Sequence, residues 1–123
     1  MKFTISYPKT KAGMKKFCKQ FGMNAIYSGK FWRRRKEDSE QWHGIVRASL
    51  MQQRIPRKQF DKPVCIIFYW NDHLDCSNHG YIGKMIEDAL KGYLIHDDSR
   101  PYVNEIRHKF YDKPFITVEL EEI

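Results

Sequence analysis

The sequence contains no long apolar run. Its longest one, Val64–Trp70, is far too short to cross a bilayer, so we expect no membrane partner. The opening Met1–Lys2–Phe3 runs straight into a strand-like pattern, and we therefore expect no signal peptide. Repeats, low-complexity segments and linkers are absent as well. A chain of 123 residues then has room for one domain around one core.

Cysteine is also scarce. The three cysteines, Cys18, Cys65 and Cys76, form no C-x-x-C pair and leave one thiol over. This pattern argues against a disulfide framework and against a structural zinc site. We expect reduced thiols and a cytoplasmic protein.

Charge is abundant and unevenly distributed. The net charge is +7, but residues 1–62 hold 16 Lys and Arg against 4 Asp and Glu, whereas residues 63–123 hold 6 against 11. The basic half also carries the aromatic residues Phe31, Trp32 and Trp42. A basic groove for phosphates beside an acidic metal pocket would produce this asymmetry, so nucleic acid is the expected partner. A solvated basic surface would explain the same composition.

The hydropathy pattern predicts an α+β fold with a mixed sheet and about three helices in the order β-α-α-β-α-β-β. We expect strands at Lys2–Tyr7, Val64–Trp70, Tyr102–Phe110 and Phe115–Leu120, and helices near residues 14–21, 38–55 and 78–91. An irregular arm is expected over residues 24–32. The continuous apolar run of the second strand is typical of a central strand that is buried on both faces.

Two acidic loops flank the last of these helices. Asp72 and Asp75 follow the central strand, and Asp97 and Asp98 precede the next one. We expect the two loops to meet at one end of the sheet, where like charges converge at a cost unless a cation neutralises them. Carboxylate oxygens suit Mg²⁺, with Mn²⁺ as the alternative. From spacing alone, the same aspartates can also be helix caps or turn residues.

The segment D-C-S-N-x5-K-x3-D-A-L-x6-D-D-S, from Asp75 to Ser99, resembles the signature of the RusA-type Holliday junction resolvases. Upstream, N-A-I-Y-S-G-K-F-W-R-R-R-K resembles the N-terminal region of phage members of that family. The likeness covers most of the chain and is specific over about residues 75–99. It implies one RusA-like nuclease domain over residues 1–123. If the chain is phage-encoded, it would act in the cytoplasm of a bacterial host.

The resemblance implies a homodimeric, Mg²⁺-dependent endodeoxyribonuclease that resolves four-way DNA junctions by paired phosphodiester hydrolysis. Asp75 and Asp98 would be catalytic metal ligands, assisted by Asp97 or Asp72. Lys84 would contact the scissile phosphate or orient water. A two-fold symmetric junction agrees with a dimer that carries two symmetry-related active sites.

One position departs from the family pattern. Ser77 stands where the family carries its second loop aspartate, which is one of the three metal ligands. Two alternatives therefore stay open: a weakly active or inactive protein that binds branched DNA, and a related metal nuclease that acts on RNA or flaps. Asp88, one helical turn after Lys84, can pair with the lysine and orient it.

The remaining candidates are contacts to nucleic acid. Under the nuclease interpretation, phosphates would be bound by the basic run Arg33, Arg34, Arg35 and Lys36. A base would stack on Trp32 or Phe31. Asn78 matches the asparagine of the family motif and would also contact the nucleic acid. A solvated approach to the helix and core aromatics are the alternatives. We interpret Trp42 as a core residue, and His73, His79 and His96 as ordinary loop histidines.

Overall fold

Four strands form one mixed sheet, as the sequence predicts, in a computed structural model that describes all of residues 1–123. The strands are β1 (Lys2–Ser6), β2 (Val64–Trp70), β3 (Val103–Phe110) and β4 (Phe115–Glu122), in the spatial order β1-β4-β2-β3. β4 pairs antiparallel with both β1 and β2, and β2 pairs parallel with β3. β2 is central because its branched and aromatic side chains are buried on both faces.

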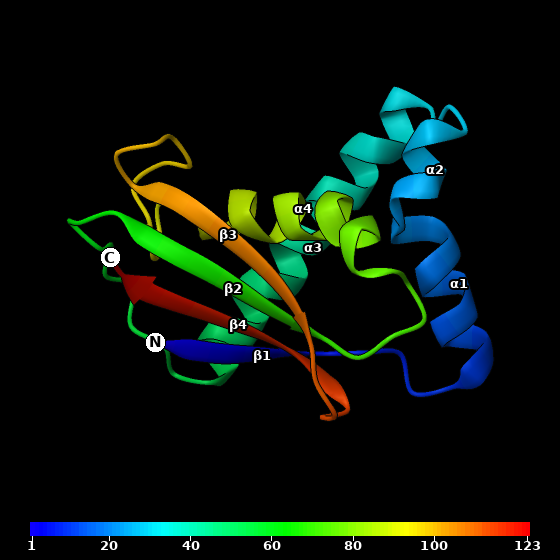
Figure 1. Ribbon diagram of the computed structural model, residues 1–123, viewed down its shortest axis with the longest axis horizontal. Helices are drawn as coiled ribbons and strands as arrows, with labels where there is room; N and C mark the ends of the chain where they lie inside the picture. The colour runs from blue at the N-terminus through cyan, green and yellow to red at the C-terminus, as the bar shows by residue number, and fades with distance from the viewer.

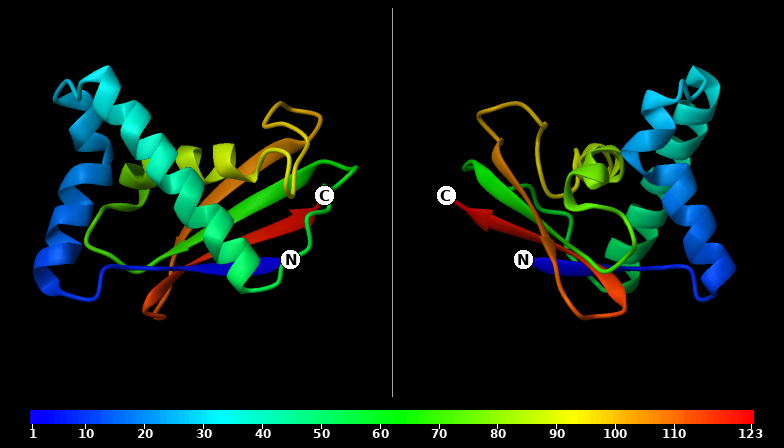
Figure 2. Two further views of the ribbon diagram at one scale, coloured as in Figure 1. Left: turned by 180° about the vertical axis from the view of Figure 1, so that it is seen from behind. Right: turned by 45° about the vertical axis from the view of Figure 1, so that its right-hand side comes forward.

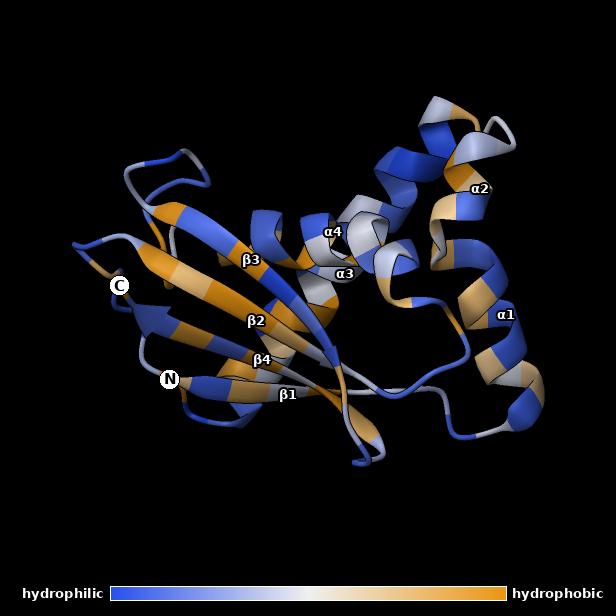
Figure 3. Cartoon of the chain, in the orientation of Figure 1, coloured by the Kyte–Doolittle hydropathy of each residue, from blue (hydrophilic) through white to orange (hydrophobic).

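The helices lie on one face of the sheet (Figure 2). They are α1 (Lys11–Phe21), α2 (Met23–Tyr27), α3 (Trp32–Gln52) and α4 (Gly80–Leu90), with a 3-10 turn, η1 (Cys76–His79), ahead of α4. The helical arm consists of α1, α2 and the first half of α3, and it projects beyond the end of the sheet at which β1 and β2 terminate (Figure 1). Colouring by hydropathy shows a strongly hydrophilic stretch at the start of α3 (Figure 3), where residues 33–38 are all charged.

Two expectations about the arm were wrong. Residues 23–27 are helical rather than irregular, and α3 begins at Trp32 instead of near Asp38. The run Arg33–Lys36 therefore lies inside the first two turns of a 21-residue helix. Arg and Lys are good helix formers, and Asp38 is buried as part of the inner stripe of α3, which is why it does not cap the helix.

The core joins α3 and α4 to the sheet. Trp42, Val46 and Leu50 repeat every fourth residue along α3 and are almost fully buried. On α4, Gly83 allows close contact with the sheet, because a Cβ at this position would lie 3.0 Å from the His108 ring and 3.5 Å from the Phe68 ring. None of the helices combines the length and apolarity needed to span a bilayer.

The parallel pairing of β2 with β3 requires α4 to cross back over the sheet. Val64 pairs with Val103 at one end of the two strands, and Trp70 pairs with Phe110 at the other. The segment that follows β2 therefore lies at the opposite end of the sheet from the segment that precedes β3. α4, with 11 residues, separates them by about 16 Å of helix.

The packing of α3 predicts that substitutions at two adjacent residues have very different effects on the free energy of unfolding. Leu50→Ala removes a side chain that is fully buried and should lower the free energy of unfolding by about 2–5 kcal/mol. Met51→Ala is the control, because Met51 is the next residue of the same helix and is 69% exposed. Urea denaturation followed by circular dichroism measures both variants. Equal losses would contradict this description of the core.

Candidate functional site

An acidic cluster with two lysines lies along the last turns of α4. One carboxylate oxygen from each of Glu87, Asp88 and Asp98 lies within 4.8 Å of the others. Lys84 Nζ donates a hydrogen bond to Asp98 Oδ2 and lies 3.3 Å from Glu87 Oε1 and 3.1 Å from Asp88 Oδ1. Lys91 Nζ lies 3.1 Å from Asp98 Oδ2. A single ammonium group thus touches three carboxylates.

The local sequence explains this arrangement. The spacing of residues 84, 87, 88 and 91 places them on one side of α4, because residues three or four apart are neighbours on a helix. Gly92 then adopts a positive φ of 76°, which ends the helix and turns the chain back. A bridge between Lys91 and Ile95 fixes this turn and brings Asp98 alongside the helix. Arg47, on α3, donates to the carbonyl oxygens of Ala89 and Lys91 and anchors the end of α4.

The charges of this cluster perturb one another. Hydrogen bonds from Lys84 and Lys91 hold the pKa of Asp98 far below its usual range. Burial opposes the charged form of Lys84, but the hydrogen bonds to Asp98 and Asp88 outweigh it and raise the pKa of the lysine. Burial raises the pKa of Glu87. At neutral pH Asp98 is therefore ionised and Lys84 is protonated.

The carboxylate oxygens of the cluster are suitable ligands for a divalent cation. Asp88 Oδ1 is buried and lies 3.1 Å from Lys84 Nζ and 3.2 Å from Lys91 Nζ, so both ammonium groups now occupy the region that a cation would take. Three carboxylates offer the oxygen ligands that hard cations prefer. The cluster can bind a metal ion if Lys84 or Lys91 moves away from Asp98 and leaves its carboxylate free to coordinate the ion.

The two acidic loops do not meet as we expected. Asp75 is exposed just before η1, at the beginning of the η1–α4 segment, whereas Asp98 lies beside the last turns of α4. The expected convergence at one end of the sheet was wrong, because parallel pairing puts the two loops at opposite ends. Neither Asp75 nor the exposed Asp97 belongs to the group formed by Glu87, Asp88 and Asp98.

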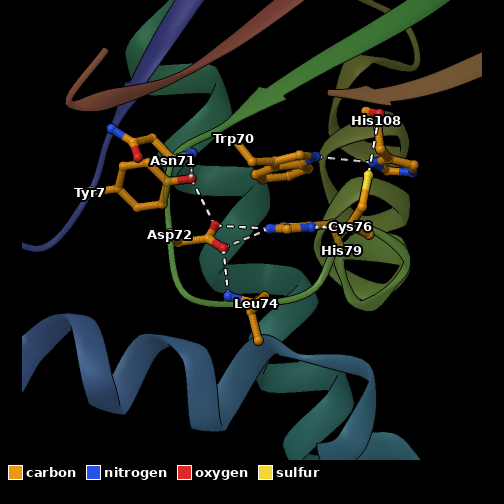
Figure 4. A network of polar contacts seen from close by, with 8 residues as sticks. All are labelled: Tyr7, Trp70, Asn71, Asp72, Leu74, Cys76, His79 and His108. Atoms are coloured by element: carbon orange, nitrogen blue, oxygen red, sulfur yellow. Dashed lines mark hydrogen bonds and ion pairs between the residues drawn. The ribbon is translucent and has the colours of Figure 1, made fainter. Parts of the chain in front are cut away.

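Asp72 has a different environment, shown in Figure 4. Its side chain is inaccessible to solvent, and its oxygens accept hydrogen bonds from Tyr7 Oη at 2.8 Å, Leu74 N at 2.9 Å and His79 Nε2 at 2.8 Å. The other ring nitrogen of His79 faces the carbonyl oxygen of Cys76 at 2.9 Å. Both ring nitrogens of His79 therefore face oxygen atoms of the protein. Asp72 and His79 thus form a buried hydrogen-bonded pair.

This pair was not foreseen in the sequence, where His79 reads as an ordinary loop histidine. His79 is fully buried and stacks on Trp70, with 4.4 Å between ring centroids. Burial opposes ionisation of Asp72, but hydrogen bonds from His79 and Tyr7 outweigh it, so the pKa of Asp72 is lowered. The only sequence signal is an aspartate and a histidine seven residues apart, directly after a buried strand.

A second buried pair supports the helical arm. Lys30 forms an ion pair with Asp38 and donates to the Gln20 carbonyl oxygen at 2.8 Å. Asp38 also accepts hydrogen bonds from Gln20 Nε2 at 3.0 Å and from Tyr81 Oη at 2.7 Å. These contacts join α1, α3 and α4. The pair was missed because Asp38 was expected to lie at the start of a helix, where an aspartate acts as a cap residue.

The expected nucleic-acid contacts lie mostly on this arm. Arg33, Arg34, Arg35, Lys36 and Trp32 are all exposed at the start of α3. Asn78 instead lies half-buried in η1, where its backbone N–H donates to the Asp75 carbonyl oxygen at 3.0 Å. Ser77 is exposed in the same turn. The basic arm and the acidic cluster therefore occupy separate parts of the molecule.

Comparison of the sequence with protein-family models found no match, and comparison with curated proteins found none either. The resemblance to RusA-type resolvases, with the residue roles that it implies, stays a prediction.

The buried Asp72–His79 pair predicts a pH-dependent contribution to stability. Because the pKa of Asp72 is lower in the folded chain, its contribution is present above about pH 4 and is lost as the pH falls further. Asp72→Asn removes one partner of the buried pair and should lower the free energy of unfolding by about 3–5 kcal/mol at pH 7. Asp61→Asn is the control, because the Asp61 side chain is 96% exposed. Urea denaturation at pH 7 and pH 3 tests this. A loss that is the same at both pH values would contradict it.

Proposed function

We propose that the protein is a Mg²⁺-dependent endodeoxyribonuclease that acts on branched DNA and resolves four-way junctions. The observation that carries the proposal is the contact of Lys84 Nζ with Glu87, Asp88 and Asp98. A group of carboxylates that binds a divalent cation, with a lysine beside it, is suited to phosphodiester hydrolysis. The DNA junction as substrate comes from the resemblance over residues 75–99.

Asp98, Asp88 and Glu87 would hold the ion, each through a carboxylate oxygen. When bound there, Mg²⁺ or Mn²⁺ lowers the pKa of an attacking water and stabilises negative charge on the phosphate. Lys84 stays protonated at neutral pH, because its hydrogen bonds raise its pKa. It would therefore donate a hydrogen bond to a phosphate oxygen and would not act as a base. Lys91 would balance the charge of Asp98.

This assignment changes the ligand set that the resemblance implies. It keeps Asp98 and Lys84 and replaces the loop aspartate Asp75 with two acids of α4. Asp72 drops out as a ligand, because its oxygens already accept three hydrogen bonds inside the protein. Asp75 remains an exposed carboxylate that can approach DNA only at the other end of α4.

The arm would supply the affinity for DNA. No ion pair involves the basic run Arg33, Arg34, Arg35 and Lys36, so these charges are free to contact phosphates.

Paired nicks in a junction need two active sites, and we propose a homodimer for that reason. β3 offers an edge for it, since it pairs only with β2 and exposes Ile106 and Phe110. Sedimentation equilibrium tests the dimer, and a monomer at micromolar concentration would contradict it.

A second candidate is a protein that binds branched DNA without cutting it. Two observations favour it: lysines already neutralise the acidic cluster, and Ser77 replaces a carboxylate of the family pattern. The discriminating result is tight junction binding in EDTA together with the absence of nicks in Mg²⁺ or Mn²⁺. A substrate panel with RNA and flap structures separates a third possibility, a related nuclease with another substrate.

The proposal predicts Mg²⁺-dependent nicking of a synthetic four-way junction, with little cutting of linear duplex. Asp98→Asn should reduce the cleavage rate at least about a hundredfold, because it removes the ion's central ligand. Asp112→Asn is the control, since Asp112 is exposed in the turn between β3 and β4. Denaturing gels of end-labelled junctions measure the rates.

Asp75→Asn distinguishes the two possible ligand sets. It should leave most of the cleavage intact if Glu87, Asp88 and Asp98 hold the ion. A loss as large as that of Asp98→Asn would support the ligand set that the resemblance implies. Cleavage that survives Asp98→Asn would contradict the proposal altogether.

A further inference from the structure

The helical arm contains a cavity of about 900 Å³ between α1, α2 and the beginning of α3. Its lining includes the cationic residues Lys16, Lys19, Lys30 and Arg34 and no acidic residue. Leu74, from the turn after β2, closes one side. The volume lies in the range of small-molecule sites in proteins.

Three of the four cations at this cavity have no anionic partner. Lys16, Lys19 and Arg34 form no ion pair anywhere in the chain. Lys30 differs, because Asp38 neutralises it and the Gln20 carbonyl oxygen accepts from it. Unpaired positive charges that surround a concave surface attract an anion. The cavity therefore favours a ligand that carries a phosphate.

The same cavity has an aromatic wall. Phe31 lines it and is 57% exposed, with its ring 6.0 Å from that of Trp32. A large apolar ring that stays exposed beside unpaired cations is typical of surfaces that bind single-stranded nucleic acid, where bases stack on aromatic side chains. The combination of a phosphate-binding region and a stacking surface matches one nucleotide.

The walls of the cavity are held in place by buried contacts. The Lys30–Asp38 pair, with its hydrogen bonds from Gln20 and Tyr81, fixes the chain just before Phe31 against α1 and α4. Gly22 permits close approach of the β2 turn, because a Cβ there would lie 2.8 Å from Leu74 Cδ2. A site that is already formed loses less entropy when a ligand binds.

We infer that this cavity binds an unpaired nucleotide of a DNA strand, with its base on Phe31 and its phosphate between Lys16, Lys19 and Arg34. A base paired within a duplex cannot stack on the wall of a cavity, so the site would select opened or branched DNA. The inference rests on the proposed function for the class of ligand. It does not depend on cleavage, because the cavity lies on the arm, apart from the acidic cluster.

The test is the affinity of the full-length protein for a labelled oligothymidylate and for a blunt duplex, measured by fluorescence anisotropy in EDTA. Phe31→Ala should weaken oligothymidylate binding about tenfold or more and change duplex binding little. Lys16→Gln combined with Lys19→Gln should weaken it as well, with a smaller dependence on salt.

Matched controls lie on the same helices. Lys15→Gln changes one charge of α1 outside the cavity, and Tyr27→Ala removes an exposed aromatic ring of α2 that does not line it. Both should bind oligothymidylate as the wild type does. Thermal melting checks that each variant folds.

Two results would overturn the inference. In the first, Phe31→Ala weakens binding of single strand and duplex equally, which would indicate a general basic surface. In the second, the wild type binds junction DNA but not oligothymidylate, which would leave the proposed function standing without this site. A third result separates the two proposals. If the protein binds oligothymidylate through Phe31 but cleaves no DNA, the nucleotide-binding cavity is supported and the proposed nuclease function is contradicted.

Discussion

The parallel pairing of β2 with β3 determines where the acidic residues of the second half of the chain lie. It requires a crossover, and α4 provides it with seven buried residues. The return of the chain after Gly92 then brings Asp98 to Lys84 and Lys91. Asp75, on the segment that leads into the crossover, is separated from Asp98 by the length of the helix. Which acids can share an ion thus follows from the topology.

Two buried pairs of polar side chains connect this sheet to its surroundings. The Asp72–His79 pair holds the turn after β2 against Tyr7, which directly follows β1. The Lys30–Asp38 pair holds the helical arm against α4, because Tyr81 of α4 donates a hydrogen bond to Asp38. Buried ions are costly unless they are paired and fully hydrogen-bonded, and removal of one partner leaves the other uncompensated. The Lys30–Asp38 pair therefore fixes the position of the arm, which carries exposed basic and aromatic side chains.

The sequence predicts the strands well, because β-branched and aromatic runs bounded by turns are strong local signals. It also predicts Trp42 as a core residue. The predictions fail where the position of a residue depends on contacts with residues that are distant in the sequence. The start of α3 was missed because Asp38, a good cap residue, is instead buried against Lys30 and Tyr81. His79 was misjudged because its partners, Asp72 and Trp70, surround it only in the folded chain.

Anomalous diffraction from crystals soaked in Mn²⁺ would show directly whether Glu87, Asp88 and Asp98 bind a divalent cation next to Lys84. We expect a single strong peak within coordination distance of Asp98 and Asp88, with Lys84 Nζ displaced from Asp98. A peak beside Asp75 with none at Asp98, or no peak on any carboxylate of the chain, would contradict it.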